Sequence, residues 1–464
     1  MANEFRTEKD TLGEVKVPAK AYWGAQAQRA VENFPISGLR AHPALVRAMV
    51  LVKMACALAN AHLGKLDEKL AAAIEKACRE VLGGKLADQW VVDVFQAGAG
   101  TSFNMNTNEV LANRANEILG APLGTYKPIH PNDHVNMSQS TNDTFPTAMQ
   151  LAAVQLGAGV VEAAENLADA LAAKGQEFDG IAKSGRTHLQ DAVPVRLGQE
   201  FMAYSLAVHR GAEAIDVALD LCRELPLGGS AAGTGLNTHP EYVPTVLERL
   251  TEITDTELAP AQDLRCAMQS MAPMAGVSSA LRNFALELIR IANDLRLLAS
   301  GPRTGLAELR LPPAQPGSSI MPGKVNPSIA ECMNMVAMQV VGNDAAVALA
   351  VQAGQLELNV MMPLIAHNVL GSMEILKNAL AAFTQRCVAG IEADAERCRT
   401  YFESSVGLAT ILNEHIGYAK AAEIAKESVQ TGKTLRELIL EKKLMSAADL
   451  EKALDPKRIT EPND

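Results

Sequence analysis

Long apolar stretches separated by polar loops dominate the middle of the chain, and their pattern predicts helices. In residues 273–298 the apolar side chains recur at steps of three or four, the spacing of one helix face. None of these stretches holds a proline beyond its first turn, and each exceeds the mean helix length of about 11–12 residues. The predicted long helices cover residues 151–173, 198–221, 273–298 and 328–351.

Residues 328–351 are apolar on nearly every face of the helix that they predict. Such a helix is stable in a soluble protein only when neighbours cover it on all sides. The pattern therefore favours a place at the centre of a bundle of several helices or several subunits. Association between copies of the chain is thus predicted from the pattern alone.

The two flanking regions have shorter patterns. Residues 45–63 and 67–81 predict helices, whereas residues 95–108 are rich in glycine, threonine and asparagine and predict a loop. In the tail, Thr434 and Ser446 are each followed three residues later by an acidic residue, which is a helix start signal. Short amphipathic helices are therefore expected at both ends.

Composition narrows the fold class. Hydrophobic residues make up 48% of the chain but aromatic residues only 4%, so the apolar content is mainly aliphatic. Alanine, leucine and methionine are strong helix formers, which predicts a mainly all-α fold. The length of 464 residues exceeds one compact core and indicates two or three domains.

Net charge and cysteine usage limit the classes of partner and of site that we expect. The net charge of −11, without a run of lysine and arginine, argues against nucleic acid. Seven scattered cysteines without a CxxC pair argue against disulfides and structural zinc and favour buried thiols. The charged start resembles no signal peptide, and no uninterrupted apolar stretch is long enough to span a bilayer. A cytoplasmic protein without a membrane partner is expected.

Several cofactor motifs are absent from the sequence. It contains no GxxxxGK[ST] phosphate loop, no complete GxGxxG fingerprint, no HExxH and no GxSxG. Chemistry based on ATP, NAD or zinc is therefore disfavoured. We predict no cofactor and assign no metal site.

The strongest candidate for chemistry is the segment 317–327, GSSIMPGKVNP. Its glycines and prolines interrupt regular structure, so it predicts a shaped loop. Asn326 and Pro327 predict a helix start, with Asn326 as the cap and Pro327 at the first helical position. A helix N-terminus attracts anions, and Lys324 precedes it directly, so the loop predicts a carboxylate site. Two hydroxyl groups lie on the same loop, those of Ser318 and Ser319.

Three further polar segments carry hydroxyl, amide or imidazole groups. Residues 138–144 precede a predicted long helix, residues 185–191 include His188, and residues 98–106 contain hydroxyl groups and amides. Each segment alone also fits an ordinary structural role, as a helix cap, a structural histidine and a turn, respectively. Both interpretations stay open at this point.

Taken together, these segments resemble the fumarase/aspartase superfamily. GSSIMPGKVNP resembles its signature, and the resemblance extends from about residue 5 to the C-terminal tail. Five other segments follow in the order and spacing of the family, namely GAGTSFNMNTNEV, HPNDHVNMSQSTND, GRTHLQDAVP, GTGLNTHPEY and GQLELNV.

The resemblance implies a three-domain fold whose long central helices form the twenty-helix core of a homotetramer. It also implies active sites that combine segments from three subunits. The expected domains are an N-terminal mixed helical domain at 1–139, a central long-helix bundle at 140–395 and a small C-terminal helical domain at 396–464.

The same resemblance implies a lyase that removes a proton next to a carboxylate through an aci-carboxylate intermediate. Ser318 would be the base, activated by loop N–H groups and Lys324. His188, paired with an acid that matches Glu331, would act on the leaving-group side. The implied substrate-binding residues are Thr101, Ser140, Thr141, Asn142, Thr187, Ser319, Lys324 and Asn326. A second dicarboxylate site would involve His130, Asn132 and Asp133.

Two substrates compete for this chemistry. The segments YWGAQ, FQ, HPND and NTHPEY resemble class II fumarase, which reversibly hydrates fumarate to L-malate, and we take this as the main prediction. Ala99, Thr141, GQLELNVM and LDPKRITEP resemble aspartase, so aspartate ammonia-lyase is the alternative. Met362, however, stands where aspartases often carry glutamate.

A third interpretation is a non-catalytic structural tetramer, because relatives in the wider superfamily serve as lens proteins. A scaffold would be free to lose the catalytic groups. Ser318, His188 and Lys324 are all present in this chain, so this interpretation is the least favoured.

Overall fold

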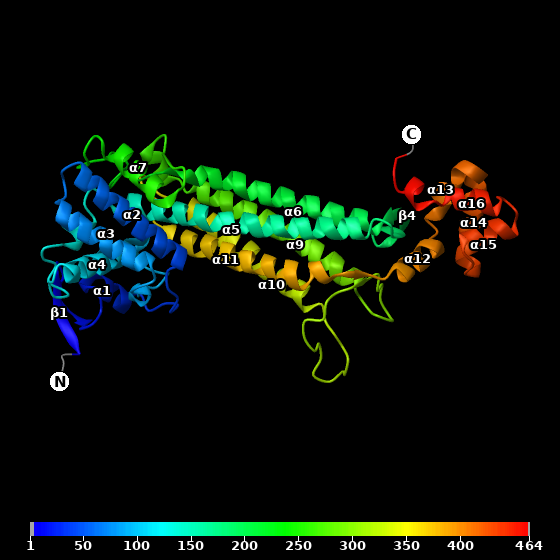
Figure 1. Cartoon of the computed structure of the whole chain (residues 1–464), viewed down its shortest axis with the longest axis horizontal. Helices are drawn as coiled ribbons and strands as arrows, with labels where there is room; N and C mark the ends of the chain where they lie inside the picture. Colours follow the sequence, from blue (N-terminus) through cyan, green and yellow to red (C-terminus); the bar gives the residue numbers. More distant parts are fainter. Residues whose placement is uncertain (1–3, 463–464) are drawn as a thin grey trace. The chain divides into compact units, whose positions relative to one another are not determined.

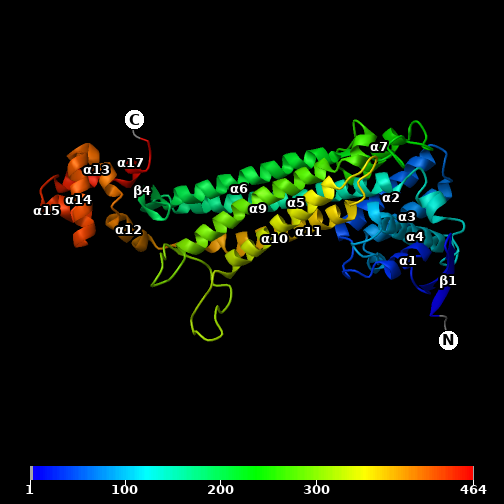
Figure 2. The same cartoon turned by 180° about the vertical axis from the view of Figure 1, so that it is seen from behind.

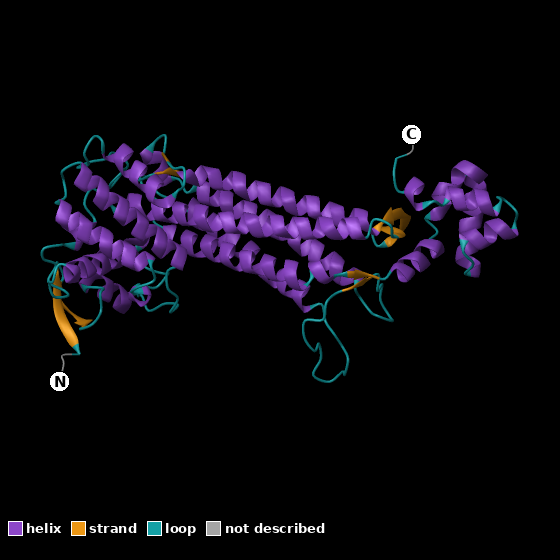
Figure 3. Ribbon diagram, viewed as in Figure 1, coloured by secondary structure: helices purple, strands orange, loops and turns teal. Residues whose placement is uncertain are grey.

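The computed structural model describes residues 4–462 and is mostly helical, as the composition predicts (Figure 3). Among these residues the strands are short and form only two-stranded sheets. The all-α prediction is therefore confirmed.

The residues cluster into two compact units, each made of three chain segments. Five long helices contribute residues to both units, so the polypeptide crosses between them repeatedly. The predicted three-domain boundaries stay a prediction. Unit 1 is Met1–Val161, Glu213–Asn283 and Gln339–Leu376, and unit 2 is Glu162–Ala212, Phe284–Met338 and Lys377–Asp464.

The four predicted long helices are confirmed, and most of their ends lie within a few residues of the prediction. The largest difference is at α5, which begins ten residues before the predicted position 151 and accommodates Pro146 in its second turn. A fifth long helix, α11, is not predicted. The long helices are α5 (Thr141–Glu177), α6 (Leu197–Asp220), α9 (Ala272–Leu298), α10 (Ser328–Gln352) and α11 (Met362–Arg386).

Unit 1 contains the N-terminal elements labelled in Figure 1. Helix α2 packs against α3 and α7, and α3 also packs against α4. The helices predicted at 45–63 and 67–81 are confirmed as α2 and α3. The elements are β1 (Phe5–Asp10), β2 (Gly13–Pro18), α1 (Ala25–Asn33), α2 (Pro43–His62), α3 (Glu68–Leu82), α4 (Thr101–Ile118), β5 (Glu224–Leu225), α7 (Tyr242–Thr254), β6 (Ala259–Pro260) and α8 (Leu264–Gln269).

The predicted loop at 95–108 is wrong beyond residue 100, where helix α4 begins. Most of its polar side chains are buried, and several bond to a neighbouring segment of the chain. The Asn106 side chain accepts from the Val91 N–H at 2.9 Å and donates to the Gln89 carbonyl at 2.9 Å. The Trp90 indole donates to the Thr107 hydroxyl at 3.0 Å. Tertiary hydrogen bonds thus override the local turn preference.

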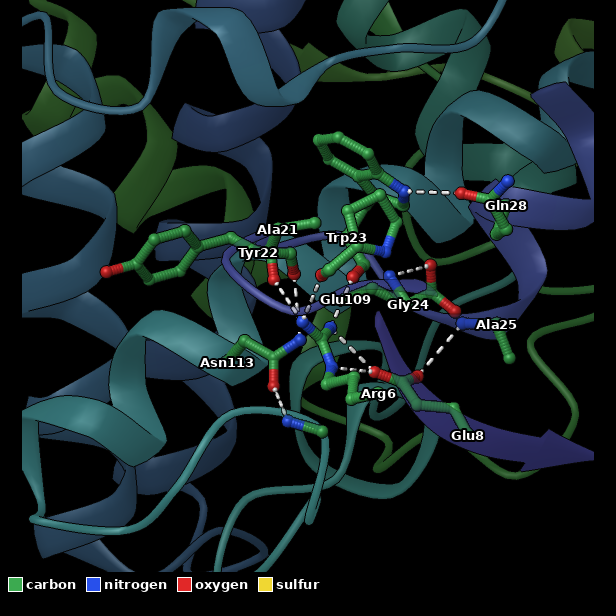
Figure 4. Close-up of polar contacts among 12 residues, drawn as sticks. Arg6, Glu8, Ala21, Tyr22, Trp23, Gly24, Ala25, Gln28, Glu109 and Asn113 are labelled. Atoms are coloured by element: carbon green, nitrogen blue, oxygen red, sulfur yellow. Dashed lines mark hydrogen bonds and ion pairs between the residues drawn. The ribbon is translucent and has the colours of Figure 1, made fainter. Parts of the chain in front are cut away.

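A buried polar cluster fixes strand β1 to helices α1 and α4 (Figure 4). The Arg6 guanidinium lies 2.7 Å from the Glu8 carboxylate and donates to four backbone carbonyls between residues 18 and 23. Glu109 of α4 accepts the N–H groups of Gly24, Gln26 and Ala27 at the start of α1. The N-terminus of α1 is therefore satisfied by a carboxylate from another helix.

Unit 2 contains the hairpin β3–β4 and the C-terminal helices, which gather into their own hydrophobic cluster (Figure 2). The predicted helix start signals are confirmed, because Thr434 forms a capping box with Glu437 and Ser446 caps α16. The elements are β3 (Ala182–Thr187), β4 (Gln190–Arg196), β7 (Leu309–Arg310), β8 (Glu392–Ala393), α12 (Ala395–Ser404), α13 (Leu408–Ile416), α14 (Tyr418–Thr431), α15 (Leu435–Glu441), α16 (Ala447–Ala453) and α17 (Pro456–Ile459).

Two sequence expectations about apolar and thiol groups need correction. Helices α2 and α10 are long and apolar enough to cross a membrane by length and composition, because single polar residues such as Lys53 barely lower their mean hydropathy. The apolar window of α2 is 72% buried, but that of α10 only 28%. All seven cysteines are free, and five are buried, but Cys266 and Cys332 are exposed.

Candidate active site

The N-terminus of α5 in unit 1 presents three predicted substrate-binding residues. The Ser140 hydroxyl accepts the Asn142 N–H at 3.2 Å, and the Ser140 N–H donates to the Asp143 carboxylate at 2.9 Å. This reciprocal cap means that the segment is an ordinary helix cap as well as a candidate anion site. Thr141 is nearly buried, and Asn142 donates its amide to the Ala231 carbonyl at 2.9 Å.

Asp143 connects this helix start to a second loop of unit 1. Its carboxylate is fully buried and accepts the N–H groups of Gly228 at 3.1 Å and Ser230 at 2.9 Å. Burial raises the pKa of Asp143 to about 6, while three backbone N–H bonds and the nearby Lys53 act in the opposite direction. The carboxylate thus holds the Ser140 cap in a defined position.

A fully buried lysine lies beneath the same helix start. Lys53 of α2 donates to the side-chain carbonyl of Asn136 at 2.9 Å and to that of Gln139 at 2.8 Å. Burial lowers the pKa of Lys53 to about 8, and the surrounding acidic groups oppose this. A protonated Lys53 therefore adds positive potential below a site that is predicted to bind anions.

Helix α4 brings Thr101 to the same region of unit 1. The Asn104 amide donates to the Thr141 hydroxyl at 3.0 Å and to Asn136 at 3.2 Å, which couples α4 to the α5 cap. Thr101 is exposed at the first turn of α4. The N-termini of α4 and α5 therefore place two positive dipole ends within one compact unit.

The predicted second dicarboxylate site forms a tight turn in unit 1. The Nδ1 atom of His130 accepts the N–H groups of Asn132 at 3.2 Å and Asp133 at 3.3 Å. Asn132 and Asp133 are exposed, and the His130 ring packs edge-on against Tyr126. The turn is compatible with surface binding, but the role stays a prediction.

His188 occupies the tip of the β3–β4 hairpin in unit 2. The strands pair Arg186 with Asp191 and Thr187 with Gln190, so His188 and Leu189 form a two-residue turn. Both turn residues have positive φ angles, 54° for His188 and 61° for Leu189. Thr187 and His188 are exposed. The hairpin therefore projects the imidazole from its end.

The segment 317–327 forms a loop that is closed at its base (Figures 1 and 2). The Gly317 N–H donates to the Lys324 carbonyl at 2.8 Å, and the Asn326 amide donates to the Gly317 carbonyl at 2.8 Å. A Cβ atom on Gly317 would lie 2.7 Å from both the Asn326 nitrogen and the Lys324 oxygen, so this close approach requires glycine.

Within this loop, Ser318 already sits in a small nest of N–H groups. Its Oγ atom accepts the N–H groups of Ile320 at 3.2 Å and Met321 at 2.9 Å. Hydrogen bonds donated to an oxygen favour its deprotonated form. The loop geometry thus supports Ser318 as a base, while Ser319 and Lys324 are exposed beside it.

The predicted roles of Asn326 and Pro327 at the helix start are wrong by one position. Helix α10 begins at Ser328, and the Glu331 N–H bonds to the Pro327 carbonyl, so Pro327 is the cap. Asn326 does not cap the helix, because its side-chain amide donates to the Gly317 carbonyl at the base of the loop. Glu331 is exposed in the first turn of α10, and no hydrogen bond or ion pair joins it to His188 among residues 4–462 of one chain.

Three residues that support the site are absent from the sequence prediction. Lys53 is a cation among buried apolar residues of α2, a signal that the sequence does contain. Asn104 and Asp143 lie inside quoted motifs, but their partners are distant in the sequence. Within the described part of the chain, no group of three or more His, Cys, Asp or Glu side chains is placed to hold a metal ion.

Comparison with known proteins supports the family resemblance of these segments. The sequence profile described as "Lyase" matches residues 13–342, and the profile described as "Fumarase C C-terminus" matches residues 408–461. The aspartate ammonia-lyase of Bacillus subtilis is 48% identical over 99% of this chain and 97% of its own length. The class II fumarate hydratase of Halobacterium salinarum is 51% identical over 99% and 98%.

Structural comparison gives the same result. A crystal structure described as fumarate lyase:delta crystallin from Brucella melitensis, bound to cobalt, has a TM-score of 0.96 and 49% identity. It covers 99% of this chain and 100% of its own. Further relatives from Pseudomonas and Helicobacter species, 46–48% identical, are named aspartate ammonia-lyase. The chain belongs to the fumarase/aspartase superfamily of lyases.

Proposed function

We propose that this protein is an aspartate ammonia-lyase, which converts L-aspartate to fumarate and ammonia. The base takes the proton from C3, a double bond forms between C2 and C3, and the C2–N bond breaks with its electron pair leaving on nitrogen. The observation that carries the proposal is that relatives of that name from several genera are 46–48% identical to this chain over nearly its full length.

The loop 317–327, which we call the serine loop, supports the proton-transfer step. The two N–H groups on the Ser318 oxygen favour its anionic form, and Lys324 on the same loop adds a positive charge. The carbanion that forms at C3 spreads its charge into the adjacent carboxylate, which requires dense hydrogen-bond donors. Asn326 and Ser319 belong to the same donor set.

The helix start of α5 supports carboxylate binding. Ser140, Thr141 and Asn142 occupy the positive end of a long helix, above the buried Lys53. Thr101 lies at the positive end of α4. His188 and Thr187 at the hairpin tip are the proposed contacts on the ammonia side, with Glu331 of another subunit as the partner of His188.

Assembly into a homotetramer is part of the same proposal. Helix α10 exposes Met335 at 61%, Met338 at 57% and Leu349 at 71%, an apolar face that needs a partner. Other copies of α10 would cover this face and complete active sites shared by three subunits. A cytoplasmic location remains our expectation.

Fumarate hydration to L-malate is the second candidate. It is favoured by the 51% identity to the Halobacterium fumarate hydratase and by the HPND and NTHPEY segments. The two reactions share the base and the carboxylate contacts. They differ in whether the leaving-group pocket accommodates ammonia or water.

The test is to supply the purified protein with L-aspartate and, separately, L-malate and to follow the ultraviolet absorbance of fumarate. Fumarate from L-aspartate is the expected result. Fumarate from L-malate alone would replace the proposal by the fumarase reaction. Fumarate from neither would remove both.

A further inference from the structure

Four charged side chains form a buried cluster at the base of the β3–β4 hairpin in unit 2. The Lys183 ammonium lies 2.8 Å from one Glu308 oxygen and 2.9 Å from Glu200. The Arg186 guanidinium lies 2.8 Å from the other Glu308 oxygen. The side chains of Lys183 and Glu308 are 1% and 0% exposed. Two cations and two anions therefore balance in the interior.

Such a cluster is a costly way to fill a protein interior. Removing charges from water is unfavourable, and apolar residues of similar volume often give equal or greater stability. Deleting one member leaves an uncompensated charge. The benefit of the cluster therefore lies in the position that it imposes on the attached segments.

One attached segment is the hairpin tip. His188 and Leu189 both hold the left-handed backbone conformation, which is unfavourable for residues other than glycine. The turn keeps this geometry only while its strands are held. Arg186 is two residues from His188, and its guanidinium also stacks on the Tyr401 ring at 5.3 Å. It is the last anchored side chain before the tip.

The other attached segment leads into the serine loop. The backbone of Glu308 is fixed on both sides, because its N–H donates to the Leu298 carbonyl at 2.9 Å and its carbonyl accepts the Asp394 N–H at 2.9 Å. Strand β7 follows directly and continues into the loop that carries Ser318. One carboxylate thus joins the β3–β4 hairpin to the start of strand β7, the strand that precedes the loop 317–327.

We infer that Glu308 is a positioning residue, which fixes the Thr187–His188 tip of the hairpin through Arg186 and Lys183 and ties the hairpin to the backbone that leads into strand β7. It does not touch substrate. This inference rests on the proposed lyase function for its kinetic consequence, but the anchoring itself is independent of the reaction.

The test is Glu308→Gln, which keeps the shape of the side chain and removes its charge. We expect kcat to fall by about 10- to 100-fold, because small misplacements of reacting groups have effects of this size, while KM changes much less. Glu441→Gln, which removes an exposed ion pair with Lys433, is the matched control.

Amide hydrogen exchange of residues 182–196 gives a readout that does not depend on activity. We expect faster exchange there in Glu308→Gln and unchanged exchange in α2 and α3 of unit 1. If the wild type converts neither L-aspartate nor L-malate, the proposed function fails, and the exchange still decides the anchoring.

A folded Glu308→Gln variant with wild-type kcat, KM and hairpin exchange would overturn the inference. If Glu308→Gln does not fold, Arg186→Lys takes its place, because it keeps the charge and loses the planar guanidinium fork and the stacking on Tyr401. We expect an intermediate loss of kcat in that variant. Wild-type kcat and exchange in Arg186→Lys would then overturn the inference.

Discussion

Glu109 is an ionisable group whose environment is not visible in the sequence. Its side chain accepts three N–H groups at the start of α1 and lies near Glu8 (Figure 4). Burial raises its pKa to about 7, chiefly by desolvation. Between pH 4.5 and 7 the folded chain keeps this proton while the unfolded chain has released it. The contribution of Glu109 to stability therefore falls as the pH rises through that interval.

The corresponding prediction compares the wild type with Glu109→Gln, whose side chain does not titrate. Between pH 5 and 7.5, the wild type should lose about 2–3 kcal/mol of unfolding free energy relative to the variant. Urea unfolding at fixed protein concentration measures this difference. Parallel pH dependences of the two proteins would show that Glu109 titrates normally in the folded chain.

The serine loop and the hairpin histidine could be predicted at the residue scale because their motifs are contiguous. Ser318, Lys324 and His188 each lie in a short polar segment of the sequence. The supporting ions could not be predicted in this way. Lys183 and Glu308 are 125 positions apart, and only the fold brings them together.

At the scale of elements, the apolar period locates the long helices but not every end of them. Helix α4 was misassigned because its asparagines and threonines bond to neighbouring segments, which no local pattern reveals. Helix α11 begins with Met362 and Pro363 and carries polar residues among its apolar ones, which weakens its pattern. Hydrophobic periodicity thus predicts helices whose buried faces are apolar, and it misses helices whose buried side chains are partly polar.

Close helix packing in unit 2 gives a prediction at this scale. A Cβ atom on Gly198, at the start of α6, would lie 2.3 Å from the Gly175 carbonyl of α5 and 2.7 Å from the Asp179 backbone. Because these atoms belong to backbone, Gly198→Ala should destabilise the protein by about 1–3 kcal/mol. Gly180→Ala is the control, since nothing lies within 4 Å of its Cβ position. Equal urea midpoints of the two variants would contradict this packing.

At the scale of the whole molecule, the pattern of residues 328–351 predicts a helix that needs cover on all sides. In the single chain, α10 instead leaves Met335 and Met338 exposed. An apolar helix face that is exposed in a single copy of a chain is typical of a surface that associates with another copy. The sequence could predict that α10 needs cover, but not what supplies it.

The proposed assembly predicts that Met338→Glu dissociates the tetramer, because it places a charge on the apolar face of α10. Sedimentation velocity should show smaller species and lowered lyase activity. Val429→Glu, at an exposed position of α14, should sediment like the wild type. A tetramer unaffected by Met338→Glu, or a wild type recovered with membranes, would rule out this role of α10.

The most direct test of the account is the rate of fumarate formation from L-aspartate by the wild type and by Ser318→Ala at equal concentration. The account predicts steady fumarate production by the wild type and a loss of about 1,000-fold or more in kcat for the variant, with its tetramer and helix content unchanged. A Ser318→Ala variant that retains near-normal turnover would contradict the central role of the serine loop.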